Sequence, residues 1–201
     1  MRAAPPLVLA SASPRRAGVL SLLGLEHAVE AADVPEGFLP GEDPASHVER
    51  LAREKAVAVT RRHPGALVLA GDTVVVRDGE IMGKPRDAAE AVGMLVTLAG
   101  REHRVVTGLA LVSPGGAVHS RVEWATVRFR PLTRDEAREY VATGEPMDKA
   151  GSYGIQGRGA ALVTSVEGDY YTVVGLPVSG LVTLLRVSGW RYAFGRIAAS
   201  D

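Results

Sequence analysis

The sequence predicts an α/β protein in which a mixed, twisted sheet is flanked by helices. An apolar segment at 7–10 leads through a Ser-rich turn into an amphipathic segment, which is the pattern of a strand, a tight loop and a helix. Two long β-rich segments, 104–112 and 118–130, are joined by a turn that contains Pro114-Gly115-Gly116, which indicates an antiparallel hairpin. Because strand and helix patterns alternate elsewhere, parallel and antiparallel pairs are expected in one sheet.

Helices are predicted where apolar residues repeat with a helical period between recognisable start and stop signals. Thr133 and Glu136 form a capping box, and Gly100 and Gly144 follow two of the segments as stop signals. Proline at the first helical position opens the other three. The predicted helices are 13–24, 43–63, 87–99, 133–144 and 177–187.

Strands are predicted from β-rich segments bounded by turn residues. The segment 67–76 is expected to be a buried strand interrupted by Gly71-Asp72-Thr73, and Asp78-Gly79 turns it into a short partner. A second hairpin is expected across Glu167-Gly168-Asp169. The tail 188–201 is expected to be either docked or frayed. The predicted strands are 7–10, 67–76, 80–83, 104–112, 118–130, 162–166 and 170–174.

The composition limits the class of protein. With 201 residues and 46% hydrophobic content, the chain suits a single domain, 1–201, built as two lobes that share a core. The absence of cysteine excludes disulfides and cysteine-ligated metals. A formal net charge of zero argues against nucleic acid as a partner. No segment is long and apolar enough to span a membrane or to act as a signal peptide, so we expect a cytoplasmic protein with no membrane partner.

Lysine and side-chain amides are scarce. The lysines are Lys55, Lys84 and Lys149, and Gln156 is the one amide residue. Heat adaptation and a GC-rich genome both explain this bias, and the sequence does not separate them. In either case the remaining lysines are candidates for sites that need a compact, flexible ammonium group.

The first candidate site is the turn between the first strand and the first helix. Ser11, Arg15 and Arg16 bring a hydroxyl and two guanidinium groups to a helix N-terminus, where backbone N–H groups and the helix dipole favour an anion such as phosphate. An ordinary helix cap with two solvated arginines explains the same residues. The segment alone does not decide between these alternatives.

Lys55 and Asp72 are charged residues in apolar surroundings. Lys55 occupies an inward position of its helix, where it either extends along its stem to water or directs its ammonium group at a phosphate or a carboxylate. Asp72 lies at or beside the end of an apolar strand, where a carboxylate is costly unless it is paired or bound to a metal. A turn-forming Asp is the alternative.

The remaining candidates lie on loops. Lys84 stands between a glycine and a proline, in a rigid turn that directs its side chain. The segment 148–157 combines polar side chains with three glycines that would let the backbone approach a ligand closely, although a plain surface loop is the alternative.

Six motifs in order along the chain resemble the Maf family of nucleoside triphosphate pyrophosphatases. They are Ser11–Arg16, Leu51–Lys55, Gly71–Val74, Gly83–Pro85, Asp148–Gly157 and Val174–Pro177. The resemblance implies a two-lobed α/β fold with a central cleft, similar to that of the inosine triphosphate pyrophosphatases. It also implies a house-cleaning hydrolase that converts a nucleoside triphosphate to the monophosphate and pyrophosphate with a divalent cation, Mg²⁺ or Mn²⁺.

The resemblance also implies a substrate branch. Arg15, Thr73 and Gln156 occupy three positions that tend to separate the branches, and this combination resembles the branch acting on dTTP and UTP. The branch acting on 7-methyl-GTP would carry an aromatic residue in place of Arg15 and an acid in place of Gln156. A neutral amide both donates and accepts hydrogen bonds, as a pyrimidine edge requires.

Roles for the other residues follow from the same resemblance. Asp72 is the expected proton acceptor that activates water. The groups expected to bind the triphosphate are Ser11, Arg15, Arg16, Lys55 and Lys84. Glu36 and Asp72 are candidate ligands of the cation, but Asp72 does not easily serve as both tight ligand and free base, so the base role comes first and the ligand set stays open.

Two rival functions stay open. A non-catalytic regulator could bind nucleotide or a partner in cell division and septum formation, as family members are linked to septum formation. A nucleic-acid binder is disfavoured by the zero net charge and the 5% aromatic content. The oligomeric state is also open, and a homodimer is among the assemblies that the sequence allows.

Overall fold

The computed structural model describes residues 3–200. Its internal contacts divide the chain into two compact units. Unit 1 is formed by the described parts of Met1–Asp72, Thr107–Glu123 and Gly175–Asp201, and unit 2 by Thr73–Val106 and Trp124–Val174. Each unit is therefore assembled from segments that lie far apart in the sequence.

The elements follow the predicted alternation of strands and helices. The strands are β1 (Leu7–Leu9), β2 (Ala28–Val29), β3 (Leu67–Arg77), β4 (Glu80–Met82), β5 (Glu102–Val112), β6 (Val118–Phe129), β7 (Val163–Gly168), β8 (Trp190–Tyr192) and β9 (Ile197–Ala199). The α-helices are α1 (Pro14–Leu22), α2 (Pro44–Thr60), α3 (Ala88–Leu98), α4 (Arg134–Ala142), α5 (Tyr170–Val174) and α6 (Val178–Val187). Short 3₁₀ helices are η1 (Glu145–Asp148), η2 (Ala150–Ser152) and η3 (Gly157–Leu162).

The main sheet is mixed, which confirms the predicted fold class. Its hydrogen-bonded order is β2-β1-β3-β5-β6-β7, with β4 paired to β3. Strand β1 is parallel to β2 and to β3, and Val8 is in register with Ala28 and Val68. The pairs β3–β4 and β6–β7 are antiparallel. Strands β3, β5 and β6 contribute residues to both units.

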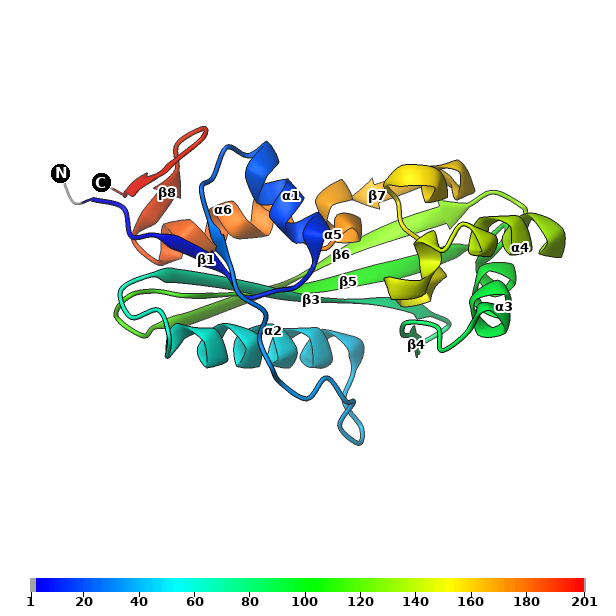
Figure 1. Ribbon diagram of the computed structural model, residues 1–201, viewed down its shortest axis with the longest axis horizontal. Coiled ribbons are helices and arrows are strands. Elements are labelled where there is room, and N and C mark those ends of the chain that lie inside the picture. Colours follow the sequence, from blue (N-terminus) through cyan, green and yellow to red (C-terminus); the bar gives the residue numbers. More distant parts are fainter. Residues whose placement is uncertain (1–2, 201) are drawn as a thin grey trace. The chain divides into compact units, whose positions relative to one another are not determined.

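In unit 1, helices cover both faces of the strands. Figure 1 shows α2 on one face and α1 and α6 on the other. The buried face of α2 carries Ala52, Ala56 and Val59, which share a core with Val8 and other strand residues. Helix α2 lies very close to the sheet, because a Cβ atom on Gly108 would stand 2.3 Å from the carbonyl oxygen of Val48.

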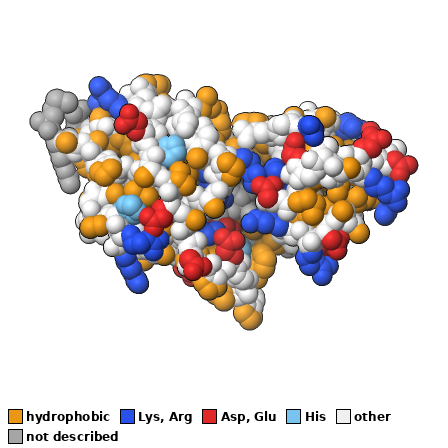
Figure 2. All heavy atoms as spheres, viewed as in Figure 1, with side chains coloured by type: hydrophobic (Ala, Val, Ile, Leu, Met, Phe, Trp, Pro, Cys, Tyr) orange, Lys and Arg blue, Asp and Glu red, His pale blue; other side chains and the backbone are white. Residues whose placement is uncertain are grey.

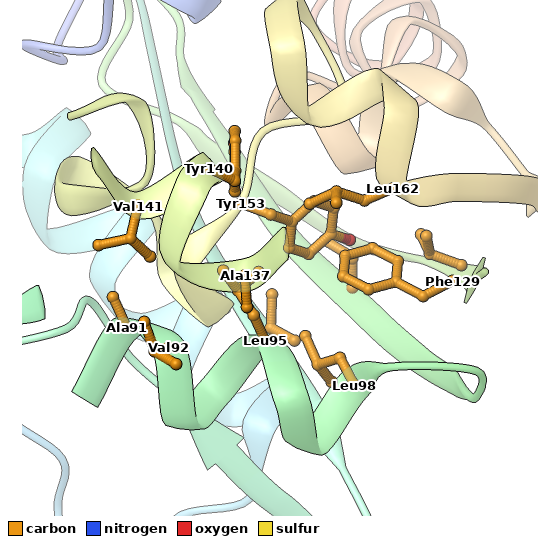
Figure 3. Packing of buried hydrophobic residues seen from close by; sticks show 13 residues of the cluster. Ala91, Val92, Leu95, Leu98, Phe129, Ala137, Tyr140, Val141, Tyr153 and Leu162 are labelled. Atoms are coloured by element: carbon orange, nitrogen blue, oxygen red, sulfur yellow. The ribbon is translucent and has the colours of Figure 1, made fainter. Parts of the chain in front are cut away.

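The core of unit 2 lies under α3 and α4. Figure 3 shows Leu95 and Leu98 of α3 facing Phe129 of β6, with Tyr140 of α4 and Tyr153 beside them. Both helices begin as predicted: the Asp87 side chain accepts from the N–H of Glu90, and Thr133 and Glu136 form the complete capping box. Because Tyr153 packs with Phe129 in this cluster, the loop around Tyr153 is joined to the core.

Strand β3 differs from its prediction in one respect. It was expected to be interrupted at Gly71-Asp72-Thr73, but it is continuous from Leu67 to Arg77. Gly71 is a point of close approach instead of a break, because a Cβ atom there would lie 3.1 Å from the Gly108 carbonyl oxygen. Asp72 therefore lies within a strand and not in a turn.

The segment 170–174 was predicted to be a strand, and this prediction is wrong because the segment forms the helix α5. A local cap and the burial of two side chains outweigh the β propensity of these residues. The Asp169 carboxylate accepts a hydrogen bond from the N–H of Tyr171, and Thr172 and Val174 are buried on the helix. Strand β7 consequently pairs with β6 and has no partner from 170–174.

The tail beyond α6 is docked in its described part. Strands β8 and β9 form an antiparallel hairpin that the sequence did not predict. Trp190 is 2% exposed, and the Tyr192 hydroxyl donates to the Leu23 carbonyl oxygen over 2.9 Å. Among residues 3–200, no helix has the length and hydrophobicity that a membrane span requires.

Candidate functional site

A buried ammonium group lies between two carboxylates in unit 1. Lys55 Nζ is 2.7 Å from Asp72 Oδ1 and 2.6 Å from Glu36 Oε1. Helix α2 directs Lys55 inward, where the residue is 6% exposed, and β3 presents Asp72 to it. Of the alternatives left open by the sequence, the structure shows an ammonium group paired with carboxylates, and Asp72 paired instead of forming a turn.

Ser11 and Arg16 form a second group where β1 leads into α1. Arg16 Nη1 donates to Ser11 Oγ over 2.9 Å, and Arg16 Nε donates to the Gly175 carbonyl oxygen over 2.8 Å. Ser13 occupies the helix cap position without a side-chain capping bond, and its N–H donates to Ser11 Oγ. The ordinary capping explanation of this turn therefore does not hold.

The charges of these two groups act on one another. Burial lowers the pKa of the Arg16 guanidinium, Asp72 raises it, Arg15 lowers it further and Glu36 raises it. Such coupling requires these charges to be near neighbours. We call Ser11, Arg15, Arg16, Glu36, Lys55 and Asp72 the unit 1 cluster. It contains hydroxyl and cationic donors suited to phosphate, together with carboxylates able to accept a proton.

The loop that carries Glu36 is braced against α2. Glu42 accepts two hydrogen bonds from Arg50, at 2.6 and 2.8 Å, and its carboxylate lies 2.9 Å from His47 Nδ1. Phe38 stacks on the His47 ring with centroids 3.9 Å apart. The Arg50 bonds, followed by the weaker one to His47, outweigh the effect of burial and lower the pKa of Glu42 to about 2. Exposed hydrophobic side chains remain on this loop, and Figure 2 shows them at its tip.

Unit 2 holds the other predicted residues. Lys84 is exposed on the turn after β4, and this turn is tied to the glycine-rich loop because the Gly151 N–H donates to the Gly83 carbonyl oxygen over 3.0 Å. Gln156 is exposed immediately before η3. Thr73 follows Asp72 in β3 and is half-buried. The structure thus brings the Lys84 turn and the Gln156 loop together within this unit.

The donor set fits a cation that is shared with a ligand. Residues 3–200 contain no group of three or more His, Cys, Asp or Glu side chains able to hold a metal ion by themselves. Glu36 and Asp72 nevertheless place two carboxylates on the same ammonium group. One or two carboxylates, completed by phosphate oxygens and water, are the usual protein contribution to a Mg²⁺ site.

Several supporting residues were missed by the sequence reasoning. Glu42 and Arg50 brace the Glu36 loop, and Tyr140 and Glu145 bind the backbone of the glycine-rich loop. Glu145 directly precedes a proline before that loop, which is a weak signal. The Gly175 carbonyl was missed as a partner of Arg16, although 174–177 was one of the family motifs.

The chain is similar over most of its length to known proteins. The sequence model of the family described as Maf-like protein matches residues 6–188. A dTTP/UTP pyrophosphatase of Symbiobacterium thermophilum is 52% identical over 184 residues, covering 92% of this chain and 94% of that protein. A dTTP/UTP pyrophosphatase of Moorella thermoacetica is 50% identical over 187 residues, covering 91% and 95%.

Among solved structures, the Staphylococcus aureus Ham1 protein matches with a TM-score of 0.46 and 16% identity, over 62% of this chain and 71% of that one. The sequence relatives are far more similar, since about half of their residues are identical over nine-tenths of the chain. The family model and these relatives together show that the chain belongs to the family of Maf-like proteins.

Proposed function

We propose that this protein is a pyrophosphatase that hydrolyses dTTP and UTP to the nucleoside monophosphate and pyrophosphate. The observation that carries the proposal is the Asp72 carboxylate, held by the buried Lys55 ammonium group and within the field of Arg16. Both relatives described above are named dTTP/UTP pyrophosphatase and match nearly the full chain. A carboxylate among cations suits a reaction in which water must be deprotonated beside a polyanion.

Asp72 acts as the proton acceptor in this proposal. The oxygen of a water molecule attacks the α-phosphorus while its proton passes to the Asp72 carboxylate. The bond from the α-phosphorus to the oxygen that bridges the α- and β-phosphates breaks, and pyrophosphate leaves with that electron pair. Lys55 orients Asp72 through the 2.7 Å ion pair. Since an ammonium group has three donors and two serve Glu36 and Asp72, one remains for a phosphate oxygen.

The other cations bind and neutralise the triphosphate. Arg15 and Lys84 are assigned to phosphate oxygens, together with Ser11 and the N–H groups at the start of α1. Arg16 contributes its charge, but two of its donors already hold Ser11 and the Gly175 carbonyl oxygen. Its role is thus partly to position the turn that carries the phosphate-binding groups.

A divalent cation, Mg²⁺ or Mn²⁺, would be held by Glu36 and Asp72 together with phosphate oxygens. When bound, such a cation supplies charge neutralisation for the leaving pyrophosphate. The base role of Asp72 takes precedence over its ligand role, which leaves Glu36 as the first candidate ligand. Arg15, Thr73 and Gln156 are assigned to substrate choice, because an amide matches the donors and acceptors of a uracil or thymine edge. A cytoplasmic location is part of the same proposal, and a homodimer stays a prediction.

The proposal is tested by incubating the purified protein with each common ribo- and deoxyribonucleoside triphosphate, with Mg²⁺ or Mn²⁺, and measuring pyrophosphate and nucleoside monophosphate. We expect equimolar release of both products, fastest with dTTP and UTP and abolished by a chelator. Release of inorganic phosphate instead of pyrophosphate would contradict the assigned bond cleavage. Nucleotide binding without any turnover would favour the rival function of a non-catalytic regulator.

A further inference from the structure

The backbone on both sides of Gln156 is held by one polar cluster in unit 2. Before Gln156, the Gly154 N–H donates to the Tyr140 hydroxyl oxygen over 3.2 Å. After Gln156, the Gly159 N–H donates to Glu145 Oε1 over 2.9 Å. The Arg158 N–H donates to Glu145 Oε2 over 3.0 Å. The Tyr140 hydroxyl closes the cluster by donating to Glu145 Oε1 over 2.8 Å.

Both side chains of this cluster stand on well-supported elements. Tyr140 is 7% exposed near the end of α4, where Figure 3 shows it beside Tyr153 in the core. Glu145 begins η1 and is half-buried. Burial opposes ionisation of Glu145, but the bonds from Gly159, Tyr140 and the Arg158 N–H outweigh it and lower the pKa of this carboxyl. Burial raises the pKa of Tyr140, so its hydroxyl keeps the proton that it donates.

The loop wraps the cluster without spare room. Gly157 has φ +67°, and a Cβ atom on it would lie 3.0 Å from Glu145 Oε2. A Cβ atom on Gly159 would lie 2.2 Å from the Gly154 carbonyl oxygen and 2.6 Å from the Tyr140 hydroxyl. These contacts require glycine at both positions. Gln156 lies between the two attachment points, with extended backbone at φ −89° and ψ 165° and an exposed side chain.

We propose that Glu145 and Tyr140 are positioning residues that set nucleobase selectivity by fixing the direction of Gln156. The inference rests on the proposed function, in which the Gln156 amide faces the base. An amide discriminates between bases only when its donor and acceptor are held in place. Tyr140 and Glu145 hold them by fixing the backbone on both sides of Gln156. The cluster does not include Asp72, which acts in the chemical step. Loss of the cluster should therefore change the preference among triphosphates more than it changes the rate of that step.

The test uses Tyr140→Phe, which keeps the buried ring and removes the hydroxyl, and Glu145→Gln and Glu145→Ala. We expect the ratio of kcat/KM for UTP to that for ATP to fall about tenfold in Tyr140→Phe, the effect of losing one hydrogen bond to a charged group. The change lies in KM for UTP, with kcat nearly constant. Glu145→Gln retains more selectivity than Glu145→Ala, because the amide oxygen still accepts one backbone bond.

Two matched controls separate this role from general stability. Glu139→Gln alters an exposed glutamate of α4 that lies outside the cluster, and Tyr170→Phe removes the hydroxyl of a tyrosine that is 41% exposed. Both are expected to keep the wild-type selectivity. Amide hydrogen exchange gives a direct readout, since the N–H groups of Arg158 and Gly159 should exchange faster in Glu145→Ala than in the wild type.

A fall in kcat by the same factor for every triphosphate, with an unchanged UTP to ATP ratio, would overturn the inference and leave Tyr140 and Glu145 as structural residues. Failure of the proposed function would show differently, as a wild-type protein that releases pyrophosphate from no triphosphate. In that case calorimetric binding of UTP and ATP to the same variants decides whether the cluster sets base preference, because it needs no turnover. Equal affinity ratios in wild type and Tyr140→Phe would then reject it.

Discussion

Lys55 is a buried cation whose charge is balanced by two carboxylates, and this arrangement limits what each residue can be replaced by. The Lys55 side chain is 8% exposed and that of Asp72 is 13% exposed, so solvent screens their 2.7 Å pair only weakly. Removing one partner of such a pair typically costs about 3–5 kcal/mol, because the other charge stays buried without compensation. A test of the chemistry at Asp72 must therefore preserve the hydrogen bond to Lys55.

Asp72→Asn meets that requirement. The amide oxygen still accepts from Lys55, but an amide cannot accept the proton of an attacking water. We expect kcat for dTTP and UTP to fall by about 10²–10⁴, the usual contribution of acid–base catalysis, with KM changing less. Steady-state pyrophosphate release measures the loss. Asp135→Asn, at an exposed position of α4, is the matched control and should keep full activity. Near-normal turnover by a folded Asp72→Asn protein would reject the base role.

Single residues show where sequence reasoning succeeds. Lys55 and Asp72 stood out because a charge in an apolar pattern needs a partner, and the structure supplies that partner. The bond from Arg16 to the Gly175 carbonyl was not predictable in the same way, because the two residues are 159 positions apart and a backbone acceptor has no residue-type signal. Glu145 was missed for the same reason, since two of its partners are backbone N–H groups.

Elements with strong local signals were predicted correctly, and those decided by tertiary contacts were not. The capping box fixed the start of α4, and Asp78-Gly79 fixed the turn between β3 and β4. The stretch 170–174 has β-prone side chains, but the Asp169 cap and burial make it the helix α5. The two-residue strand β2 pairs only because β1 is beside it, so it carries no signal of its own.

The packing of α2 on β5 predicts a sharp steric effect. In Gly108→Ala the new methyl group would lie 2.3 Å from the Val48 carbonyl oxygen and 2.8 Å from the Glu49 nitrogen, both in the helix backbone. Because backbone atoms cannot rotate away as a side chain does, the helix and the sheet would have to separate. The helix that moves is the one that carries Lys55. We expect the free energy of unfolding to fall by about 3 kcal/mol, measured by urea denaturation.

Gly93→Ala is the control for this prediction. Gly93 lies inside α3, and a Cβ atom there meets nothing within 4 Å. Alanine should therefore stabilise α3 by about 0.5–1 kcal/mol through its higher helix propensity. Similar effects of the two substitutions would show that α2 does not pack against Gly108 as closely as described.

At the scale of the whole molecule, charge is balanced overall and concentrated locally. The 23 Lys and Arg residues offset the 23 Asp and Glu residues, and Figure 2 shows both signs interspersed on the face that it draws. Zero net charge argued against nucleic acid, yet the unit 1 cluster gathers Arg15, Arg16 and Lys55 in one place. Affinity for a small polyanion depends on such a local arrangement, so the net charge does not exclude a triphosphate.

The stability of the whole protein should depend on pH through His103. This residue is 3% exposed, packs edge to face against both Phe129 and Tyr153, and has Nε2 2.7 Å from the Tyr153 hydroxyl oxygen. Burial, assisted by the charge of Arg77, lowers its pKa to about 4. The unfolded chain has the ordinary value of about 6.5, so between about pH 4 and 6.5 the unfolded state binds more protons. The free energy of unfolding is therefore not reduced by His103 above about pH 6.5, and it falls as the pH drops through this window.

The expected loss is up to about 3 kcal/mol between pH 7 and pH 4, from a pKa difference of about 2.5. Urea denaturation across this range measures it, with His103→Gln as the comparison because glutamine does not titrate. The variant is less stable at pH 7, but its stability should change little from pH 7 to 5, where the wild type already loses part of this term. Carboxyl groups with a lowered pKa, such as Glu145, act mainly below about pH 4.5, outside most of this window. Parallel pH profiles for both proteins would show that His103 does not carry the effect.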